Sequence, residues 1–496
     1  MTGTLYGVGL GPGDPELMTV KAARLISEAS VIAYHCARHG RSIARSVAEP
    51  YLREGQIEEK LVYPVTTETT DHPGGYEGAI ADFYELSAKR LAEHLDAGRD
   101  VVLLCEGDPF FYGSYMYMHE RLSGRFEAVV VPGVTSVSAA SSVFGRPLVQ
   151  RDEVLTVLPG TLPAPELARR LADTDAAAVL KLGRTFSSVR EAFAEAGKLD
   201  DAVYVERATW GQQRIEPLAS VDPSTVPYFS LALLPSPAYA SRRSSPASPP
   251  AATPSAGEVV VVGLGPAGPE WLTPEAAAEL DAAEHVVGYG PYVARVPQKA
   301  GQQRHASGNR VEADRAREAL SLAASGSRVA VVSSGDPGVF AMASAVLEQV
   351  SAGHGAGVRV RIVPGVTAAQ AAASRVGAPL GHDYCVLSLS DRLKPWEIIE
   401  KRLDAAGAAD LVLALYNPAS RTRTTQLADA RAVLLRHRSA GTPVVVARDV
   451  GGPEEDIRIT TLGDLDPATV DMRCLLIVGS SKTRAENGIV WTPRSY

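Results

Sequence analysis

The stretch VVVPGVTSVSAASSVFGRPL, which begins at Val129, returns later in the chain as RIVPGVTAAQAAASRVGAPL from Arg361. Both copies are typical of a buried strand, a turn with the same Pro-Gly-Val-Thr sequence, and a helix rich in small residues. Upstream of each copy lie two further landmarks in the same order. A strand runs into a glycine loop (LYGVGLGPGDPELMT and VVVVGLGPAGPEWLT), and another runs into Gly-Asp-Pro (VVLLCEGDPFFYGS and VAVVSSGDPGVFAM). The order and spacing predict an internal repeat of one module.

Buried apolar strands alternate with helical stretches within each copy, which is typical of an α/β fold with parallel sheets covered on both faces. After Pro-Gly-Val-Thr the pattern restarts and becomes more mixed, so we expect two α/β domains in each of two tandem modules. The predicted modules span residues 1–235 and 258–496. Residues 236–257, almost entirely Ser, Pro and Ala, are predicted to be a mobile tether that leaves the modules spatially independent and is the first site of proteolysis.

The composition restricts the classes of function. The chain has 496 residues, of which 45% are hydrophobic and 21% charged, and a formal net charge of -8, so no general positive field attracts nucleic acid. Four cysteines stand far apart without CxxC spacing, which argues against a zinc site and against disulfides. Neither a signal peptide nor a membrane-spanning apolar run is present in the sequence, and we expect a cytoplasmic protein.

The glycine loops raise the question of a dinucleotide site. Gly263, Gly265 and Gly268 satisfy G-x-G-x-x-G, but in the first loop Asp14 stands where the last glycine belongs. Each loop also carries a proline that lacks the N–H a pyrophosphate would need. The next strand ends in tyrosine rather than in the acid that binds ribose. A nicotinamide or flavin site is therefore disfavoured. The plainer alternative, that each glycine only permits a tight turn, stays open for any single loop.

Taken together, GLGPGDPELMT, Gly-Asp-Pro and PGVTS resemble the tetrapyrrole (corrin/porphyrin) methylase family over essentially all of both modules. CEGDPFFYGSYMYM and YVERATWGQQRI make the first module similar to precorrin-2 C20-methyltransferases. VVGYGPYV, LYNPASRTRTTQL and VARDVGGPEEDIRITTL make the second similar to precorrin-3B C17-methyltransferases, which contract the ring. The resemblance implies S-adenosylmethionine as cofactor, one per module, in a cleft between the two domains of each module. It also implies precorrins as substrates.

The resemblance places a set of residues on the cofactor side of each module. In the first module these are Gly107, Asp108, Pro109, Thr135, Ser136, Leu182, Ala208 and Thr209. In the second they are Gly335, Asp336, Pro337, Thr367, Ala368, Leu415, Asp449 and Val450.

The Gly-Asp-Pro turns suit a site for methyl transfer, which depends mainly on positioning two reactants. Gly107 and Gly335 let the backbone approach a ligand closely, and the prolines stiffen the turn. Asp108 and Asp336 supply either charge or a hydrogen bond that closes the loop. The alternative is that each aspartate only caps its own turn.

Precorrins carry several carboxylates, so arginines that bind them in a bidentate manner are expected around the substrate. Each one could equally be a solvated surface charge. By resemblance the first loop borders the tetrapyrrole, although Ala267 and Gly268 replace the Gly-Asp of the first copy. The substrate candidates are Pro12, Gly13, Asp14, Arg38, Arg41, Arg184, Pro266, Arg421, Arg423 and Arg448. The general base is not identified; the candidates are Asp108, Asp336, Tyr34 and Tyr289, and no metal ligands are predicted.

These observations predict a bifunctional methyltransferase of corrin (cobalamin) synthesis that acts on precorrin-2 at C20 and on precorrin-3B at C17. Three alternatives remain. The substrates could be the cobalt-containing intermediates of the anaerobic route. The target could be RNA or protein, which other members of the superfamily methylate. One module could be inactive and serve as a binding partner. Because family members usually dimerise, we expect a homodimer or pairing of the two modules.

Overall fold

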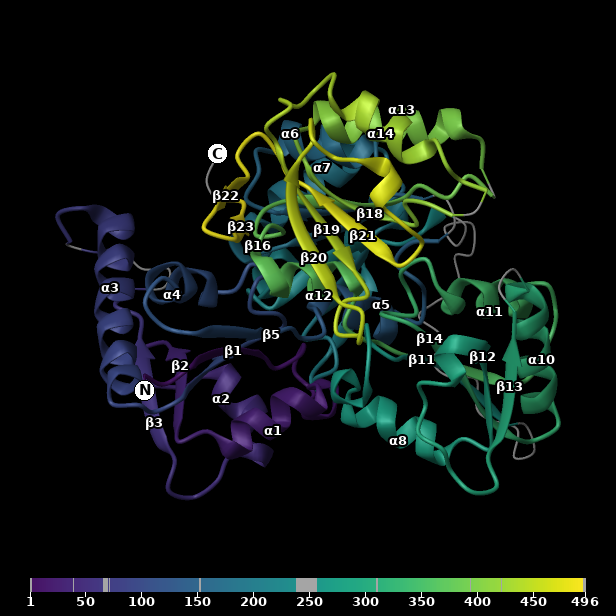
Figure 1. The fold of residues 1–496 in the computed structure, drawn as a ribbon, viewed down its shortest axis with the longest axis horizontal. Coiled ribbons are helices and arrows are strands. Elements are labelled where there is room, and N and C mark those ends of the chain that lie inside the picture. The colour runs from purple at the N-terminus through teal and green to yellow at the C-terminus, as the bar shows by residue number, and fades with distance from the viewer. Residues whose placement is uncertain are drawn as a thin grey trace. The chain divides into compact units, whose positions relative to one another are not determined.

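The computed structural model describes residues 2–38, 40–65, 70, 72–150, 153–237, 257–308, 311–392, 394–420 and 422–493. The chain divides into two compact units, Met1–Thr135 and Ser136–Tyr496, which are described separately. The colours of Figure 1 follow the chain from the first unit into the second. The interior of the predicted tether, residues 238–256, and the substrate candidate Arg421 lie outside the described residues.

The first unit is a five-stranded parallel sheet with the strand order β3-β2-β4-β1-β5. The strands are nearly fully buried at its centre, as the apolar runs predict: Leu5, Val31 and Val101 have no exposed surface. Its strands are β1 (Leu5–Gly9), β2 (Val31–Cys36), β3 (Ile57–Val62), β4 (Val101–Cys105) and β5 (Ala128–Val131); its helices are α1 (Val20–Glu28), α2 (Ile43–Ala48), α3 (Gly75–Asp96) and α4 (Tyr115–Leu122).

The second unit begins with α5 (Ser136–Phe144) and contains a second five-stranded parallel sheet. Its order, β13-β12-β14-β11-β15, repeats that of the first unit position by position, which confirms the repeat inferred from the landmarks. The strands are β11 (Glu258–Gly263), β12 (His285–Tyr289), β13 (Gln303–Ser307), β14 (Arg328–Ser333) and β15 (Arg359–Val363); the helices are α8 (Pro274–Ala282), α9 (Gly290–Val293), α10 (Glu312–Ala324) and α11 (Met342–Ser351).

The remainder of both modules forms one mixed sheet of ten strands, in the order β20-β19-β21-β18-β17-β6-β7-β10-β8-β9. Helices α13 and α14 lie over part of this sheet in Figure 1. The first module supplies β6 (Leu155–Pro159), β7 (Ala176–Leu180), β8 (Val203–Glu206), β9 (Arg214–Pro217), β10 (Ser230–Leu234), α6 (Ala164–Ala172) and α7 (Phe186–Glu195). The second supplies β17 (Tyr384–Ser388), β18 (Val412–Tyr416), β19 (Pro443–Arg448), β20 (Asp456–Thr461), β21 (Cys474–Val478), α12 (Ala368–Val376), α13 (Trp396–Ala408) and α14 (Gln426–Leu434). A small sheet joins β16 (Gly377–Ala378), β22 (Arg484–Glu486) and β23 (Ile489–Trp491).

The two modules meet where β6 pairs with β17 in antiparallel register, with Val157 opposite Tyr384 and Leu155 opposite Val386. A buried ion pair joins Arg170 of α6 to Asp383, both less than a tenth exposed. This ladder joins a strand of each predicted module within the second unit, and association of separate chains stays a prediction. The expectation of spatially independent modules is wrong for the parts that lie in the second unit, because a shared hydrogen-bond ladder fixes the register of β6 on β17.

Two residues assigned to the tether are packed against the modules instead. Ser236 is fully buried and its hydroxyl donates to the Glu153 carboxylate at 2.6 Å. The Gly257 amide donates to the Ala323 carbonyl at 2.8 Å. Both ends of the tether are therefore anchored to the modules, and the module boundaries at 235 and 258 stay predictions.

The four cysteines are buried and free. Among the residues that the structure describes, no group of three His, Cys, Asp or Glu side chains could hold a metal ion. The described helices also include none that is long and apolar enough to cross a membrane.

Candidate functional site

In the second module, the two glycine landmarks meet at the carboxyl edge of the parallel sheet. Gly265, which follows β11, and Gly335, which follows β14, exchange backbone hydrogen bonds of 3.2 and 2.9 Å. Both have positive φ angles, of 64° and 67°, a conformation that favours glycine. The first glycine loop and the Gly-Asp-Pro turn therefore form one connected piece of backbone.

Asp336 ties this piece to the Pro-Gly-Val-Thr turn that follows β15. Its carboxylate accepts from the Gly338 amide at 2.8 Å and from the Gly365 amide at 3.2 Å. The side chain is only 4% exposed, and burial raises the pKa of Asp336 to about 6. These bonds give Asp336 the loop-closing role that the sequence left as one of two options.

Asp108 makes the same connection in the first unit. Its carboxylate accepts from the Phe110 amide at 3.0 Å and from the Gly133 amide at 3.1 Å. Burial raises the pKa of Asp108 to about 7. Gly11 and Gly107 exchange backbone hydrogen bonds, as their counterparts do. Both modules thus retain an intact carboxylate clamp between the Gly-Asp-Pro and Pro-Gly-Val-Thr turns.

Thr367 and Ala368 lie at the start of α12, close to the Gly-Asp-Pro turn. The Thr367 hydroxyl caps the helix by accepting from the Gln370 amide at 3.2 Å. A Cβ atom placed on Gly335 would lie 3.7 Å from the Ala368 nitrogen. The structure therefore brings these four predicted cofactor residues, Gly335, Asp336, Thr367 and Ala368, together.

At the end of β18, Tyr416 rather than Leu415 presents its side chain to these turns. The Tyr416 hydroxyl accepts from the Ala369 amide at 3.2 Å, also bonds Thr367, and burial raises its pKa to about 12. The Leu415 side chain is 1% exposed and packs in the core beneath α13 and α14. Strict alternation along the strand could have identified Tyr416, because neighbouring residues point to opposite faces.

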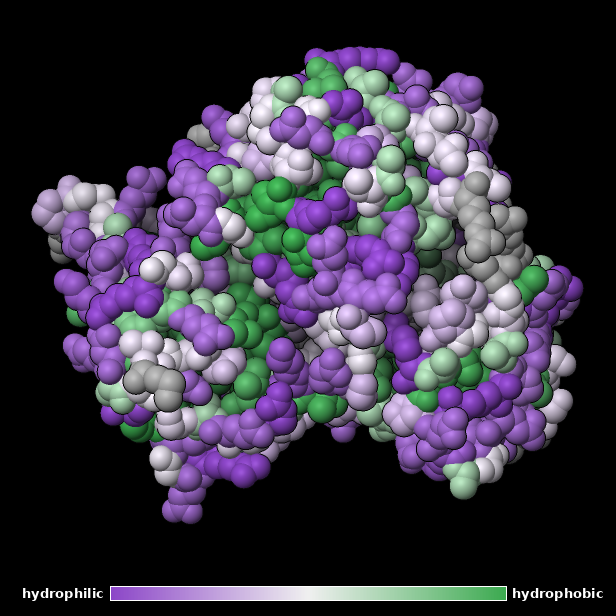
Figure 2. Space-filling view, viewed as in Figure 1, coloured by the Kyte–Doolittle hydropathy of each residue, from purple (hydrophilic) through white to green (hydrophobic). Residues whose placement is uncertain are grey.

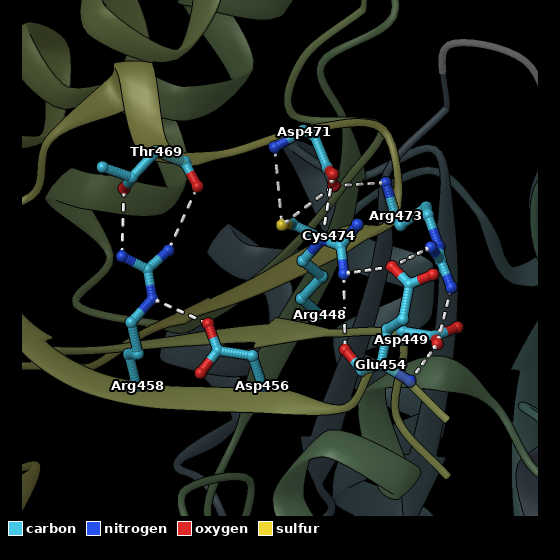
Figure 3. A network of polar contacts seen from close by, with 9 residues as sticks. All are labelled: Arg448, Asp449, Glu454, Asp456, Arg458, Thr469, Asp471, Arg473 and Cys474. Atoms are coloured by element: carbon cyan, nitrogen blue, oxygen red, sulfur yellow. Dashed lines mark hydrogen bonds and ion pairs between the residues drawn. The ribbon is translucent and has the colours of Figure 1, made fainter. Parts of the chain in front are cut away.

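Asp449 follows β19 in a strained turn, with a φ angle of 48°. Its carboxylate accepts from the Glu454 amide at 3.1 Å and pairs with Arg473 at 2.5 Å. Figure 3 shows that Arg448 is likewise held, by Glu454 at 3.1 Å and by Asp471 at 2.9 Å. Arg448 is thus already neutralised by two carboxylates. The interpretation of Arg448 as a partner for substrate carboxylates is not supported by these contacts.

This charged network gives a hydrophilic surface to the part of the molecule where β19 and β20 lie, as Figure 2 shows. Val450, next to Asp449, is 8% exposed. At Gly451, with a φ angle of 77°, an added Cβ atom would lie 2.8 Å from the Trp271 indole nitrogen. The turn after β19 thus packs on Trp271.

Trp271 and Arg295 hold the first glycine loop of the second module, and the sequence analysis missed both. An added Cβ on Gly265 would lie 3.0 Å from Trp271. Arg295 donates to the Leu264 carbonyl at 3.1 Å, to the Gly265 carbonyl at 2.7 Å, and to the Ser334 hydroxyl at 3.0 Å. No local sequence signal marks a half-buried arginine as a partner for a loop that is distant in sequence.

The remaining predicted cofactor residues of the first module are divided between the two units. Thr135 and the Gly-Asp-Pro turn belong to the first unit, whereas Ser136, Leu182, Ala208 and Thr209 belong to the second. Ser136 is the first residue of α5, and Leu182 is 1% exposed within an apolar core. Thr209 has a φ angle of 72°, and its amide donates to the Gln213 side chain at 3.0 Å.

Some substrate candidates have exposed side chains, and others form hydrogen bonds within the protein. Arg38, Arg41 and Arg184 are exposed, and Pro12, Gly13 and Pro266 are partly exposed. Asp14 caps a short turn by accepting from the Glu16 amide at 2.9 Å.

Arg423 is only 4% exposed, and its guanidinium donates to the Asn417 carbonyl at 3.1 Å and to the Ser390 hydroxyl at 3.4 Å. It therefore stabilises the segment that follows β18. The interpretation of Arg423 as a substrate ligand is not supported by these contacts.

The two tyrosine candidates for a base lie on equivalent strands. Tyr34 is 1% exposed, its hydroxyl donates to Glu58 at 2.6 Å, and burial raises its pKa well above the usual value. Tyr289 packs edge-on against Tyr292 with ring centroids 5.2 Å apart. Tyr34 thus packs in the core, and neither contact singles out a base.

The comparisons with known proteins agree with this architecture. The model of the family described as tetrapyrrole (corrin/porphyrin) methylases matches the chain twice, over residues 4–222 and 258–466. Over its whole length the chain is 61% identical to the cobalamin biosynthesis protein CobIJ of Mycobacterium tuberculosis (strain ATCC 25618 / H37Rv), and it covers 96% of that protein.

Three shorter relatives each align with about half of the chain. The precorrin-2 C(20)-methyltransferase of a Sinorhizobium species is 52% identical, over 47% of this chain and 95% of its own length. The precorrin-3B C(17)-methyltransferase from the same source is 47% identical, over 48% of this chain and 97% of its own length. The probable cobalt-factor III C(17)-methyltransferase of Salmonella typhimurium is also 47% identical, over 48% of this chain and 98% of its own length. The chain belongs to the tetrapyrrole (corrin/porphyrin) methylase family.

Proposed function

We propose that the chain is a bifunctional S-adenosylmethionine-dependent C-methyltransferase of cobalamin synthesis. The first module methylates precorrin-2 at C20, and the second methylates precorrin-3B at C17 with ring contraction. The observation that carries the proposal is the carboxylate clamp, which is intact in both copies of one family module: Asp108 on the Gly133 amide and Asp336 on the Gly365 amide. Similarity to a cobalamin biosynthesis protein along the whole chain, and to a precorrin-2 C(20)- and a precorrin-3B C(17)-methyltransferase over about half of it each, supports the proposal.

The residues present fit a nucleoside-bearing cofactor. Gly335 exposes backbone without a side chain at the sheet edge, and α12 begins beside it at Ala368. Gly335, Pro337, Thr367, Ala368 and Val450 would hold the cofactor in the second module, with Gly107, Pro109, Thr135 and Ser136 as counterparts in the first. When bound, S-adenosylmethionine supplies an activated methyl group.

The protein's own contribution is positioning. Asp336 fixes two turns to each other, Tyr416 fixes the start of α12, and Arg295 fixes the first glycine loop. Rigid loops that hold two reactants in line can lower the activation barrier by several kcal/mol, up to about 7–11 kcal/mol in ideal cases.

The cobalt-containing substrate remains a second candidate for the second module. The relative named as a cobalt-factor III methyltransferase is as similar to this chain as the one named for precorrin-3B. RNA is a poorer candidate, because the net charge of -8 opposes a polyanion.

The test incubates the full chain with S-adenosylmethionine and, in separate reactions, with precorrin-2 or precorrin-3B, followed by mass spectrometry of the tetrapyrrole. We expect one methyl addition to each substrate, at C20 of precorrin-2 and at C17 of precorrin-3B. Parallel reactions with metal-free and cobalt-loaded tetrapyrroles decide the form of the substrate. Calorimetric titration with S-adenosylhomocysteine should give two equivalents per chain, and one equivalent would show that one module is inactive.

A further inference from the structure

A helix of the first module contacts the predicted cofactor turn of the second. Ser138 lies in α5, is 3% exposed, and its hydroxyl hydrogen-bonds the Asp336 carboxylate. Asp336 therefore has three donors: two amides of its own module, Gly338 and Gly365, and one hydroxyl of the other module.

The backbone beside Asp336 is held by the first module as well. The Val149 amide donates to the Gly338 carbonyl at 3.3 Å, and the Phe340 amide donates to the Val149 carbonyl at 3.4 Å. These bonds form a parallel bridge between Val149 and Val339. A Cβ atom placed on Gly338 would lie 3.3 Å from the Ser141 hydroxyl oxygen. The Gly-Asp-Pro segment of the second module is thus packed directly against α5 and the chain that follows it.

We propose that Ser138 is a positioning residue for the second module's cofactor turn, so that the C17 site is complete only when the first module is docked. The proposal rests on the proposed function, because it assumes that the turn at Asp336 borders the cofactor. It goes further because it assigns a residue of the first module, Ser138, to the cofactor site of the second module.

The physical reason is the cost of burying a carboxylate. An ionised carboxylate away from water needs hydrogen-bond donors, and a hydroxyl that donates to it favours the charged form. The titratable group that faces Asp336 from β18 is Tyr416, which burial keeps neutral up to a pKa of about 12. Loss of the Ser138 hydroxyl would raise the pKa of Asp336, and the clamp would loosen as the carboxylate takes up a proton.

The experiment compares Ser138→Ala with Ser142→Ala in the full chain. Ser142 lies on the same helix and donates across the same interface, to the Ile362 carbonyl at 2.5 Å, but not to Asp336. We expect Ser138→Ala to raise the KM for S-adenosylmethionine in C17 methylation about 3- to 10-fold, the range for one lost hydrogen bond. The KM in C20 methylation should stay unchanged, and Ser142→Ala should leave both values unchanged.

Two measurements do not depend on turnover. In calorimetric titration with S-adenosylhomocysteine, Ser138→Ala should weaken one of the two binding events. The pH at which that event is half lost should move upward, because the hydroxyl that favours ionised Asp336 is gone.

The inference is overturned if Ser138→Ala leaves the C17 step and its pH midpoint unchanged, or if Ser142→Ala has the same effect, since interface loosening would then explain it. Equal damage to both methylation steps would overturn it too. Failure of the proposed function has a different signature: the wild-type chain would bind no S-adenosylhomocysteine and methylate neither precorrin.

Discussion

At the scale of single residues, the two aspartates have the same structural role in the two copies. Each carboxylate accepts a hydrogen bond from the glycine amide of the Pro-Gly-Val-Thr turn, and each aspartate is almost completely buried. A carboxylate offers two oxygens to two amides, which an amide side chain cannot do, because its NH₂ group would face an N–H donor. Aspartate is therefore required at these two positions because its carboxylate accepts from two backbone amides.

Replacing Asp336 by Asn should impair C17 methylation far more than C20 methylation. At least one buried amide would lose its acceptor, which costs about 1–3 kcal/mol. Mass spectrometry should show supplied precorrin-3B left unmethylated, while supplied precorrin-2 is still methylated at C20. The matched variant Asp108→Asn should do the reverse and leave precorrin-2 unconverted. Equal loss of both steps in both variants would contradict the assignment of one clamp to each site.

The raised pKa of Asp336 gives a prediction for stability. Its native pKa of about 6 lies above the ordinary value of 3.8. Between these values the native state binds more protons than the unfolded state, so the free energy of unfolding contributed by this group falls as pH rises. The loss continues as pH rises through the native pKa of about 6 and is complete only well above it.

Melting temperatures of the wild type and of Asp336→Asn, measured from about pH 4 to pH 7, report this effect. We expect the wild type to lose stability relative to the variant as pH rises through this window. A difference that does not change with pH would contradict the raised pKa.

At the scale of elements, the junction of β6 and β17 makes two half-sheets into one. Both strands are fully buried, and the ladder is extended by the Arg170–Asp383 ion pair and by Arg402 with Asp175 at 2.8 Å. Such an interior junction leaves neither strand as an exposed edge that could pair with other chains.

Replacing Arg170 by Met should strongly destabilise the protein, because it leaves Asp383 buried without its principal cation, at a cost of about 3–5 kcal/mol. Thermal unfolding measures this change. The control is Arg436→Met, whose ion pair with Glu400 is exposed and should contribute about 0–1 kcal/mol. Similar melting temperatures for the two variants would contradict the importance of the buried pair.

At the scale of the whole molecule, the sequence of the tether predicts two modules joined only by a mobile linker. In the structure, the ten-stranded sheet contains strands of both modules. Ser236 and Gly257 are packed on the modules, so both ends of the tether are fixed. The β6–β17 ladder joins described strands of both modules.

Cleavage within residues 238–256 should consequently leave one particle. We expect limited proteolysis to give two fragments on a denaturing gel that elute together in size-exclusion chromatography at the mass of the intact chain. Fragments that elute separately would show that the β6–β17 ladder does not hold the modules on its own.

The sequence by itself determined the repeat, the α/β class and the turns at the carboxyl edges. Pro-Gly-Val-Thr, Gly-Asp-Pro and the glycine loops are local signals, because turns and buried strands depend on neighbouring residues. Asp336, Thr367 and Ala368 lie together as predicted, since parallel strands bring their carboxyl ends to one edge.

Only the tertiary structure decided which side chains serve these turns. Tyr416 rather than Leu415 faces the turns, Arg295 donates to a loop about thirty residues away, and Arg423 bonds within its own segment. Ser138 reaches Asp336 from another module. These contacts follow from the order of strands in the sheets and from the β6–β17 junction. They join residues that are distant in sequence, and a local pattern carries no information about such partners.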